Sequence, residues 1–240
     1  MTSPARNHFL RVSAAQAAQA ELEANPLRHA TGYELMLAQL AEHKRQLKQV
    51  QSVERKADSK RRMLPEYAAW VEGVLQADSG TQDDIFMTVL VWRIDVGDFA
   101  GALPLADYAI RHKLAMPDQY QRTTACLIAE EFANMVLKDP AAIKSADVEA
   151  LVEVEAMVRD QDMPDEVRAK LHKALGYVIA ELATGHDQAN AKACREEAVT
   201  HLRRALELHD KSGVKKDIER IERDIKNAAA AGTKDRTGKS

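Results

Sequence analysis

The chain is poor in the residues that sheet proteins and disulfide-rich proteins depend on. Aromatic residues make up 5% of its 240 residues, and there are 10 glycines, 7 prolines and 2 cysteines. So few aromatic and turn-forming residues argue against a β-sandwich. A charged fraction of 30% beside a hydrophobic fraction of 45% is typical of helices with solvated outer faces. The composition therefore predicts an all-α protein, long enough for one large or two small domains.

The two cysteines, Cys126 and Cys194, are too far apart in sequence to form a Cys-x-x-Cys motif. They exclude both a disulfide framework and a zinc site of that kind, and they favour a reducing cytoplasm. Cys194 and His201 are spaced i,i+7 and can share a helix face, but two ligands do not make a zinc site. No run of eighteen apolar residues occurs, so we predict no membrane partner.

Charge is distributed unevenly along the chain. Residues 1–62 carry a net charge of +5, residues 63–210 carry −12 and residues 211–240 carry +4, for an overall charge of −3. This pattern predicts a basic helical region that contacts DNA and other subunits, an acidic body of helical hairpins, and a basic C-terminal helix with a frayed tail. A basic end of this kind suits a polyanionic partner.

The densest positive charge follows a capping box at Thr31-Gly32-Tyr33-Glu34. No proline or glycine interrupts the chain after this box, which predicts one long helix to about Arg62. Residues 43–62 carry a net charge of +6, so this helix can lie along a phosphate backbone. The predicted DNA-contacting residues are Arg6, Arg11, Arg28, Lys44, Arg45, Lys48, Arg55, Lys56, Lys60, Arg61 and Arg62.

A second use of the same helix is packing against another subunit. Its other face carries an apolar seam, made of Tyr33, Leu37, Leu40, Leu47 and Val50. DNA contact and subunit contact can both hold, because the seam and the cations occupy different faces. The acid-free first twenty residues are expected to form a basic arm that adds to the DNA contact.

Further helix starts can be recognised along the chain. Pro65 suits a first helical turn, Asp98 is an expected N-cap, and Thr81 to Asp84 resembles another capping box. Residues 96–110, and more weakly 175–206, resemble parts of tetratricopeptide units, which predicts helical hairpins in an irregular bundle. A narrow seam near the C-terminus has coiled-coil spacing and consists of Val214, Ile218, Ile221 and Ile225.

A cluster of aspartates at residues 83–98 offers a possible metal-dependent nuclease site, made of Asp83, Asp84, Asp95 and Asp98. However, Asp83 and Asp84 begin one helix and Asp98 begins another, where carboxylates ordinarily serve as caps. The final Thr237–Ser240 imitates the end of a phosphate-binding loop but follows no strand, so any use of ATP belongs to a partner. We therefore predict no catalytic residue, metal or cofactor in this chain.

Several blocks of sequence occur in the order that is characteristic of one protein family. They are Met1–Ala5, Arg11–Ala15, Pro26–Thr31, Gln82–Ile85, Trp92-Arg93, Met163–Lys173 and Gly213–Lys216. Over residues 1–226 or so, the chain resembles the small terminase subunit of temperate tailed phages of the Peduovirus type, a family often named as the endonuclease subunit.

The resemblance implies a part in packaging viral DNA in the host cytoplasm. The small subunit would bind the packaging-start, or cohesive-end, site on double-stranded viral DNA as a homo-oligomer, possibly a ring. It would then present this site to the large ATPase subunit for cutting and translocation. Two alternatives stay open: a helical-repeat adaptor that binds only protein, and a chain that is itself the metal-dependent endonuclease.

Overall fold

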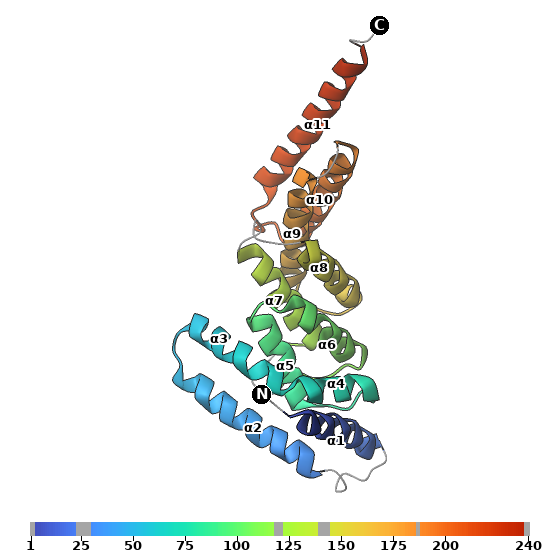
Figure 1. The fold of residues 1–240 in the computed structure, drawn as a ribbon. Coiled ribbons are helices and arrows are strands. Elements are labelled where there is room, and N and C mark those ends of the chain that lie inside the picture. Colours follow the sequence, from blue (N-terminus) through green and yellow to red (C-terminus); the bar gives the residue numbers. More distant parts are fainter. Residues whose placement is uncertain (1–2, 23–29, 118–121, 139–144, 186–187, 238–240) are drawn as a thin grey trace. The chain divides into compact units, whose positions relative to one another are not determined.

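The computed structural model describes residues 3–22, 30–117, 122–138, 145–185 and 188–237. Within these ranges the chain folds into helices α1 to α11 with two short 3₁₀ helices, and no strand occurs among them (Figure 1). This confirms the all-α prediction. Packing divides the chain into two units, residues 1–124 and 125–240. The boundaries at residues 62 and 210 were drawn on charge, so the roles of those segments remain predictions.

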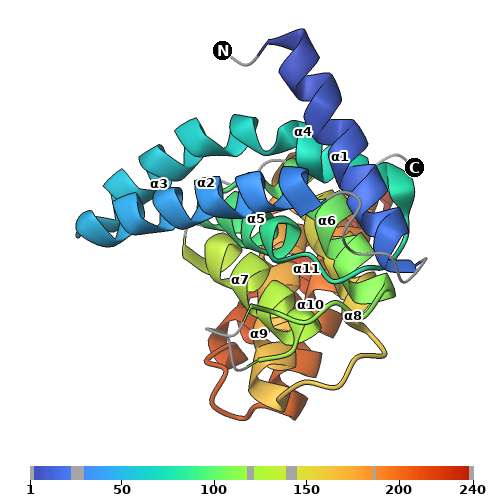
Figure 2. The same cartoon turned by 90° about the horizontal axis from the view of Figure 1, so that it is seen from below.

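The first unit consists of α1 (Pro4–Leu22), α2 (Ala30–Gln49), α3 (Val53–Met63), α4 (Ala68–Ala77), α5 (Asp84–Asp95) and α6 (Phe99–Arg111), with the 3₁₀ helix η2 (Leu64–Glu66) before α4. Helix α1 packs on α4, and α5 lies against α2, α3, α4 and α6. Figure 2 shows α2 and α3 running side by side in opposite directions. Helix α5 is therefore the central element of this unit.

Large aromatic side chains build the core of the first unit. Tyr67, Trp70, Phe86 and Tyr108 are fully buried. Tyr67 meets Trp92 edge to face, with ring centroids 5.9 Å apart. Aromatic pairs in this geometry add stability beyond the area that they bury, so a few rings organise much of the unit.

A buried carboxylate connects this core to the start of α5. Asp83 Oδ1 accepts hydrogen bonds from the backbone N–H groups of Ile85 and Phe86 at 2.8 and 2.9 Å. Its other oxygen accepts one from Trp70 Nε1 at 2.8 Å. Asp83 is thus the N-cap of α5, and the capping box predicted at Thr81 is wrong because the helix begins two residues later than that box requires.

The long helix predicted for residues 31–62 is also wrong, because the chain leaves the helical conformation at residues 50–52. Ser52 restarts the helix as the N-cap of α3, where its hydroxyl oxygen accepts from Arg55 N at 3.3 Å. The break lets α2 bury Leu40 and Leu47 while α3 buries Met63. Packing of both helices on α5 therefore outweighs the continuous helical propensity of this segment.

The apolar seam of α2 is used inside its own unit. Leu40 and Leu47 are buried there, and the Tyr33 ring lies 5.8 Å from the Trp70 ring, centroid to centroid. Subunit pairing through this seam, the alternative raised above, would require these contacts to be given up. The residues that cover the seam come from this chain.

Most of the first twenty residues, predicted to form a basic arm, lie in the packed helix α1, and their contribution to the DNA contact stays a prediction. Leu10 and Ala14 are buried against the rest of the unit. A Cβ at position 73 of α4 would lie 2.5 Å from the Arg11 carbonyl oxygen, so only glycine permits this close crossing of α1 and α4. Apolar burial, which the basic composition concealed, orders this segment.

The second unit contains α7 (Thr124–Lys138, whose first residue ends the first unit), α8 (Ser145–Val158), α9 (Asp165–Leu182), the 3₁₀ helix η4 (Ala183–Gly185), α10 (Gln188–Leu208) and α11 (Lys215–Thr237). Helices α9 and α10 of this unit form an extensive antiparallel pair, and α5 with α6 of the first unit forms a smaller one.

Both hairpins predicted from the tetratricopeptide-like segments are confirmed. The N-cap at Asp98 is also confirmed, since its side chain accepts from Gly101 N at 2.9 Å.

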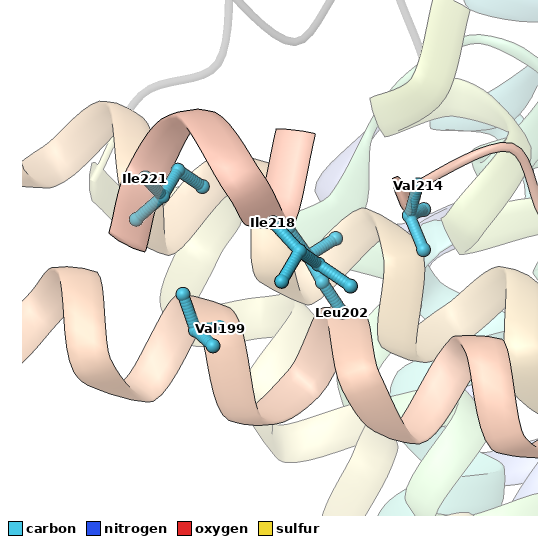
Figure 3. Packing of buried hydrophobic residues seen from close by; sticks show 5 residues of the cluster. All are labelled: Val199, Leu202, Val214, Ile218 and Ile221. Carbon is cyan, nitrogen blue, oxygen red and sulfur yellow. The ribbon is translucent and has the colours of Figure 1, made fainter. Parts of the chain in front are cut away.

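The seam near the C-terminus packs against α10. Val214, Ile218 and Ile221 are buried against Val199 and Leu202 (Figure 3). The seam spacing therefore reflects a helix pair within one chain, because a narrow apolar stripe needs only one partner helix to cover it.

Candidate nucleic-acid interface

The turn between α2 and α3 gathers cations from both helices. Lys48 precedes the turn, and Arg55, Lys56 and Arg62 follow it. Lys48, Arg55 and Arg62 are exposed, whereas Lys56 is half-buried. None of the four forms an ion pair with another described residue, and Arg62 donates a hydrogen bond to Ser59 Oγ at 3.2 Å. We call these four residues the cationic turn surface.

A surface cavity of about 680 Å³ lies against this turn. Its lining consists of Gln49, Val50, Gln51, Ser52, Arg55, Asp58, Ser59 and Arg62. Guanidinium groups, amides and hydroxyls are the donors that bind phosphate oxygens in nucleic-acid complexes. The carboxylate of Asp58 is engaged by Arg61 at 2.7 Å. The free charges of the lining are therefore positive, which suits an anionic ligand.

Two of the predicted DNA contacts face the interior of the first unit. Lys44 is half-buried, and this burial lowers its pKa; the charge of Lys48 acts in the same direction, while Asp84 opposes both. Lys60 forms an ion pair with Asp95 of α5, and its side chain is 16% exposed. These two cations help to hold α2 and α3 on α5.

Four further candidates have partners at the surface: Arg6 with Gln39, Arg11 with Glu72, Arg45 with Glu42, and Arg61 with Asp58 and the Val96 carbonyl. Exposed ion pairs contribute about 1 kcal/mol or less, so a phosphate could replace such a partner at small cost. Arg28 lies outside the described residues. Arg6, whose partner Gln39 is uncharged, and the half-buried Lys44 also form no ion pair with a described residue, but the cationic turn surface is where several unpaired cations gather.

The four aspartates that suggested a nuclease site have separate surroundings: Asp83 caps α5, Asp98 caps α6 and pairs with Arg93, Asp95 pairs with Lys60, and Asp84 is exposed. Burial raises the pKa of Asp83, and the hydrogen bonds that it accepts oppose this shift. Among the described residues, no group of three or more His, Cys, Asp or Glu is placed to hold a metal ion.

A histidine pair joins α9 and α10 and was not expected from the sequence. His172 Nδ1 lies 3.0 Å from His201 Nδ1. Burial, and to a smaller extent the charge of His201, lowers the pKa of His172 to about 4; burial also lowers the pKa of His201. Both rings are therefore neutral near pH 7. His201 meets His172 rather than Cys194, because only the packing of α9 on α10 brings together residues so distant in the chain.

The fold and the site define an all-helical protein with a cationic surface on one helical hairpin. In the part of the chain that the structure describes, no helix is long and apolar enough to span a bilayer.

Comparison with known proteins identifies the family. Residues 37–166 match the model of the phage small terminase subunit family. The chain is 49% identical over 226 residues to "Terminase, endonuclease subunit" of Escherichia phage P2, covering 94% of this chain and 87% of that protein. It is 28% identical over 184 residues to "Probable terminase, endonuclease subunit" of Haemophilus phage HP1 (strain HP1c1), covering 75% of this chain and 66% of that protein. No solved structure matches.

The chain therefore belongs to the phage small terminase subunit family, as the ordered sequence blocks predicted. Membership assigns it to phage DNA packaging, in which the small subunit works with a large terminase subunit and DNA.

Proposed function

We propose that this chain is the DNA-recognition subunit of its terminase and that it contacts the duplex through the cationic turn surface. It would bind the packaging-start site as a homo-oligomer in the host cytoplasm and present that site to the large ATPase subunit. Lysine and arginine neutralise phosphates and release condensed counterions, which positions the protein on the duplex. An oligomer would multiply these weak contacts into useful avidity.

One observation supports this proposal above the others. The four cations of the turn surface lie on the two sides of one turn, they form no ion pair with any described residue, and three of them are exposed. Two of them line a cavity with further hydrogen-bond donors. A surface that has no carboxylate partner of its own is suited to a partner that brings negative charge.

The test is the salt dependence of DNA binding by the variant K48Q/R55Q/R62Q. Each lost phosphate contact should reduce the slope of log K against log salt by about 0.9, so the triple variant should lose about 2–3 units of slope. A shift assay with a cohesive-end duplex and with a scrambled duplex, repeated across a salt series, measures this slope. A larger affinity for the cohesive-end duplex would show that the chain recognises a site.

The matched control is K192Q/R195Q/K211Q, which removes three positive charges from the second unit. It changes the net charge equally but leaves the turn intact, so its slope should stay within about half a unit of the unmodified chain. Equal losses of slope in both variants would show that the overall charge of the chain, and not the turn, sets the salt dependence of binding. An unchanged slope in K48Q/R55Q/R62Q would exclude the turn as the contact.

A second candidate is that this chain itself cuts DNA, and the name of the 49% identical P2 protein, a terminase endonuclease subunit, favours it. The isolated chain would then nick cohesive-end DNA in the presence of magnesium. Asp84→Asn is the informative variant, because Asp84 is exposed and its replacement should leave the fold intact. Magnesium-dependent nicking that this variant abolishes would assign the cutting to this chain.

A further inference from the structure

The structure presents two exposed helical surfaces of opposite charge, one in each unit. Beside the cationic turn surface, Val53 begins α3 two residues before Arg55 and has 82% of its surface exposed. On α8, Val152 is 46% exposed and lies between the exposed carboxylates of Glu149 and Glu153. Exposed large apolar side chains are few among the described residues. Each of these two exposed valines lies close in the chain to the charged residues of one surface.

The acidic surface follows one stripe of α8. Glu149, Val152, Glu153 and Ala156 are exposed and are spaced i, i+3, i+4 and i+7, so they share one face of the helix. The opposite face of α8 is buried through Val148, Leu151, Val154 and Val158. Glu149 and Glu153 form no ion pair with any described residue. We call the four exposed residues the α8 acidic face.

The negative charge continues beyond the end of α8. The connection to α9 and its first turn carry exposed carboxylates at Asp160, Asp162, Asp165 and Glu166. Arg159 lies in the same stretch, but it pairs with Glu155 at 2.8 Å. The α8 acidic face therefore belongs to a wider region of uncompensated negative charge, which would repel DNA and attract a cationic surface.

The two surfaces complement each other in charge, and each has an exposed valine close to it in the chain. Opposite charges steer association and fix which faces meet, and the burial of two valines adds an apolar contribution. The two surfaces are different patches of one chain, so a contact between copies would be head to tail. Each copy could then accept one neighbour and dock on another, and repetition of such a contact generates a ring or a filament.

We infer that, in the absence of DNA, the cationic turn surface of one copy docks on the α8 acidic face of a second copy, and that duplex DNA displaces this contact. The homo-oligomer that binds DNA in the proposed function is then held together by other surfaces. The docking stands on the two surfaces alone, whereas the displacement rests on the proposed DNA contact. The acidic face of α8 and duplex DNA would bind the same cations and therefore compete. DNA binding at the turn is thus coupled to assembly of the chain. DNA of sufficient affinity opens the contact, and assembly without DNA protects the cations.

The experiment is sedimentation velocity of the full chain over a range of concentrations, at about 50 mM and about 500 mM NaCl. The unmodified chain should self-associate at the lower salt and at least about tenfold more weakly at the higher salt. E149K/E153K should weaken self-association about tenfold or more, with unchanged or tighter DNA binding. The matched control E219K/D224K reverses two exposed carboxylates of α11 and should associate like the unmodified chain.

A charge swap makes the test specific. K48E/R55E should fail to self-associate, as should E149K/E153K, but an equimolar mixture of the two should associate because each then offers the charge that the other lacks. Recovery in the mixture would not occur if either variant were simply misfolded. Far-UV circular dichroism of each variant alone checks its helix content.

Each outcome decides a separate statement. The docking would be overturned if the unmodified chain did not self-associate, or if its self-association did not depend on protein concentration. It would also be overturned if E219K/D224K weakened self-association as much as E149K/E153K, or if the equimolar mixture did not restore it. The chain could dock as expected while a cohesive-end duplex neither binds to the assembly nor dissociates it. This result would overturn the proposed DNA contact but leave the docking standing. DNA that binds without dissociating the assembly would overturn the competition alone.

Discussion

Replacement of Asp83 by alanine should destabilise the first unit without touching the cationic turn surface. The change removes the N-cap of α5, which is worth about 1 kcal/mol. It also leaves the buried Trp70 Nε1–H without its acceptor, at a cost of about 1–3 kcal/mol. Burial disfavours the ionised carboxylate and raises its pKa, so its removal offsets part of this cost. The expected net loss is therefore about 2 kcal/mol.

Urea unfolding followed by tryptophan fluorescence measures this loss. The chain has two tryptophans, Trp70 and Trp92, and both lie in the first unit, so their emission reports the unfolding of that unit. A loss of about 2 kcal/mol should lower the unfolding midpoint by about 1 M urea. Asp84→Asn is the control, because this exposed neighbour should change stability by no more than about 0.5 kcal/mol.

A double-mutant cycle separates the two contributions. In the Trp70→Phe background the indole N–H is absent, so Asp83→Ala should cost about 1–3 kcal/mol less than it does in the unmodified chain. An equal cost in both backgrounds would show that the bond to Trp70 contributes nothing. A midpoint unchanged by Asp83→Ala would refute the assignment of Asp83 as a structural cap and would return it to the candidates for catalysis.

Two predictions concern the second unit. Ile218→Ala should lower the free energy of unfolding of this unit by about 2–4 kcal/mol, because Ile218 fills the contact between α10 and α11 (Figure 3). Urea unfolding followed by far-UV circular dichroism measures this loss, and an unchanged transition would contradict the packing. The histidine pair should make this unit less stable on acidification. The pKa of His172 lies near 4 in the folded state, below its ordinary 6.5, so the unfolded chain takes up the proton first as pH falls. The contribution of His172 to folding stability is therefore full above pH 6.5 and is lost as pH falls towards 4. Because the pair is partly solvated, we expect the free energy of unfolding to fall by about 1–2 kcal/mol between pH 7 and pH 4.5. His172→Gln should reduce this fall. An equal pH dependence of stability in the variant would exclude the histidine pair as its origin.

The sequence alone determined the helical fold class, the hairpins and the family. Helix periodicity and the scarcity of glycine, proline and aromatic residues are properties of local sequence, so they survive without knowledge of the packing. The N-cap at Asp98 and the seam through Ile218 were predicted for the same reason, since each depends on residues within a few turns of one another. The family followed from blocks of residues whose order needs no structure to be recognised.

Tertiary structure decided where the helices break and which charges are free. Nothing local distinguishes residues 50–52 from the helix around them except the capping ability of Ser52, and the chain breaks there because α2 and α3 both gain by packing on α5. Lys48 and Lys60 are equivalent in the sequence pattern, yet Lys60 meets Asp95 of α5 while Lys48 remains in solvent. Contacts between residues distant in the chain select among locally similar side chains, and such contacts are set by the packing of whole helices.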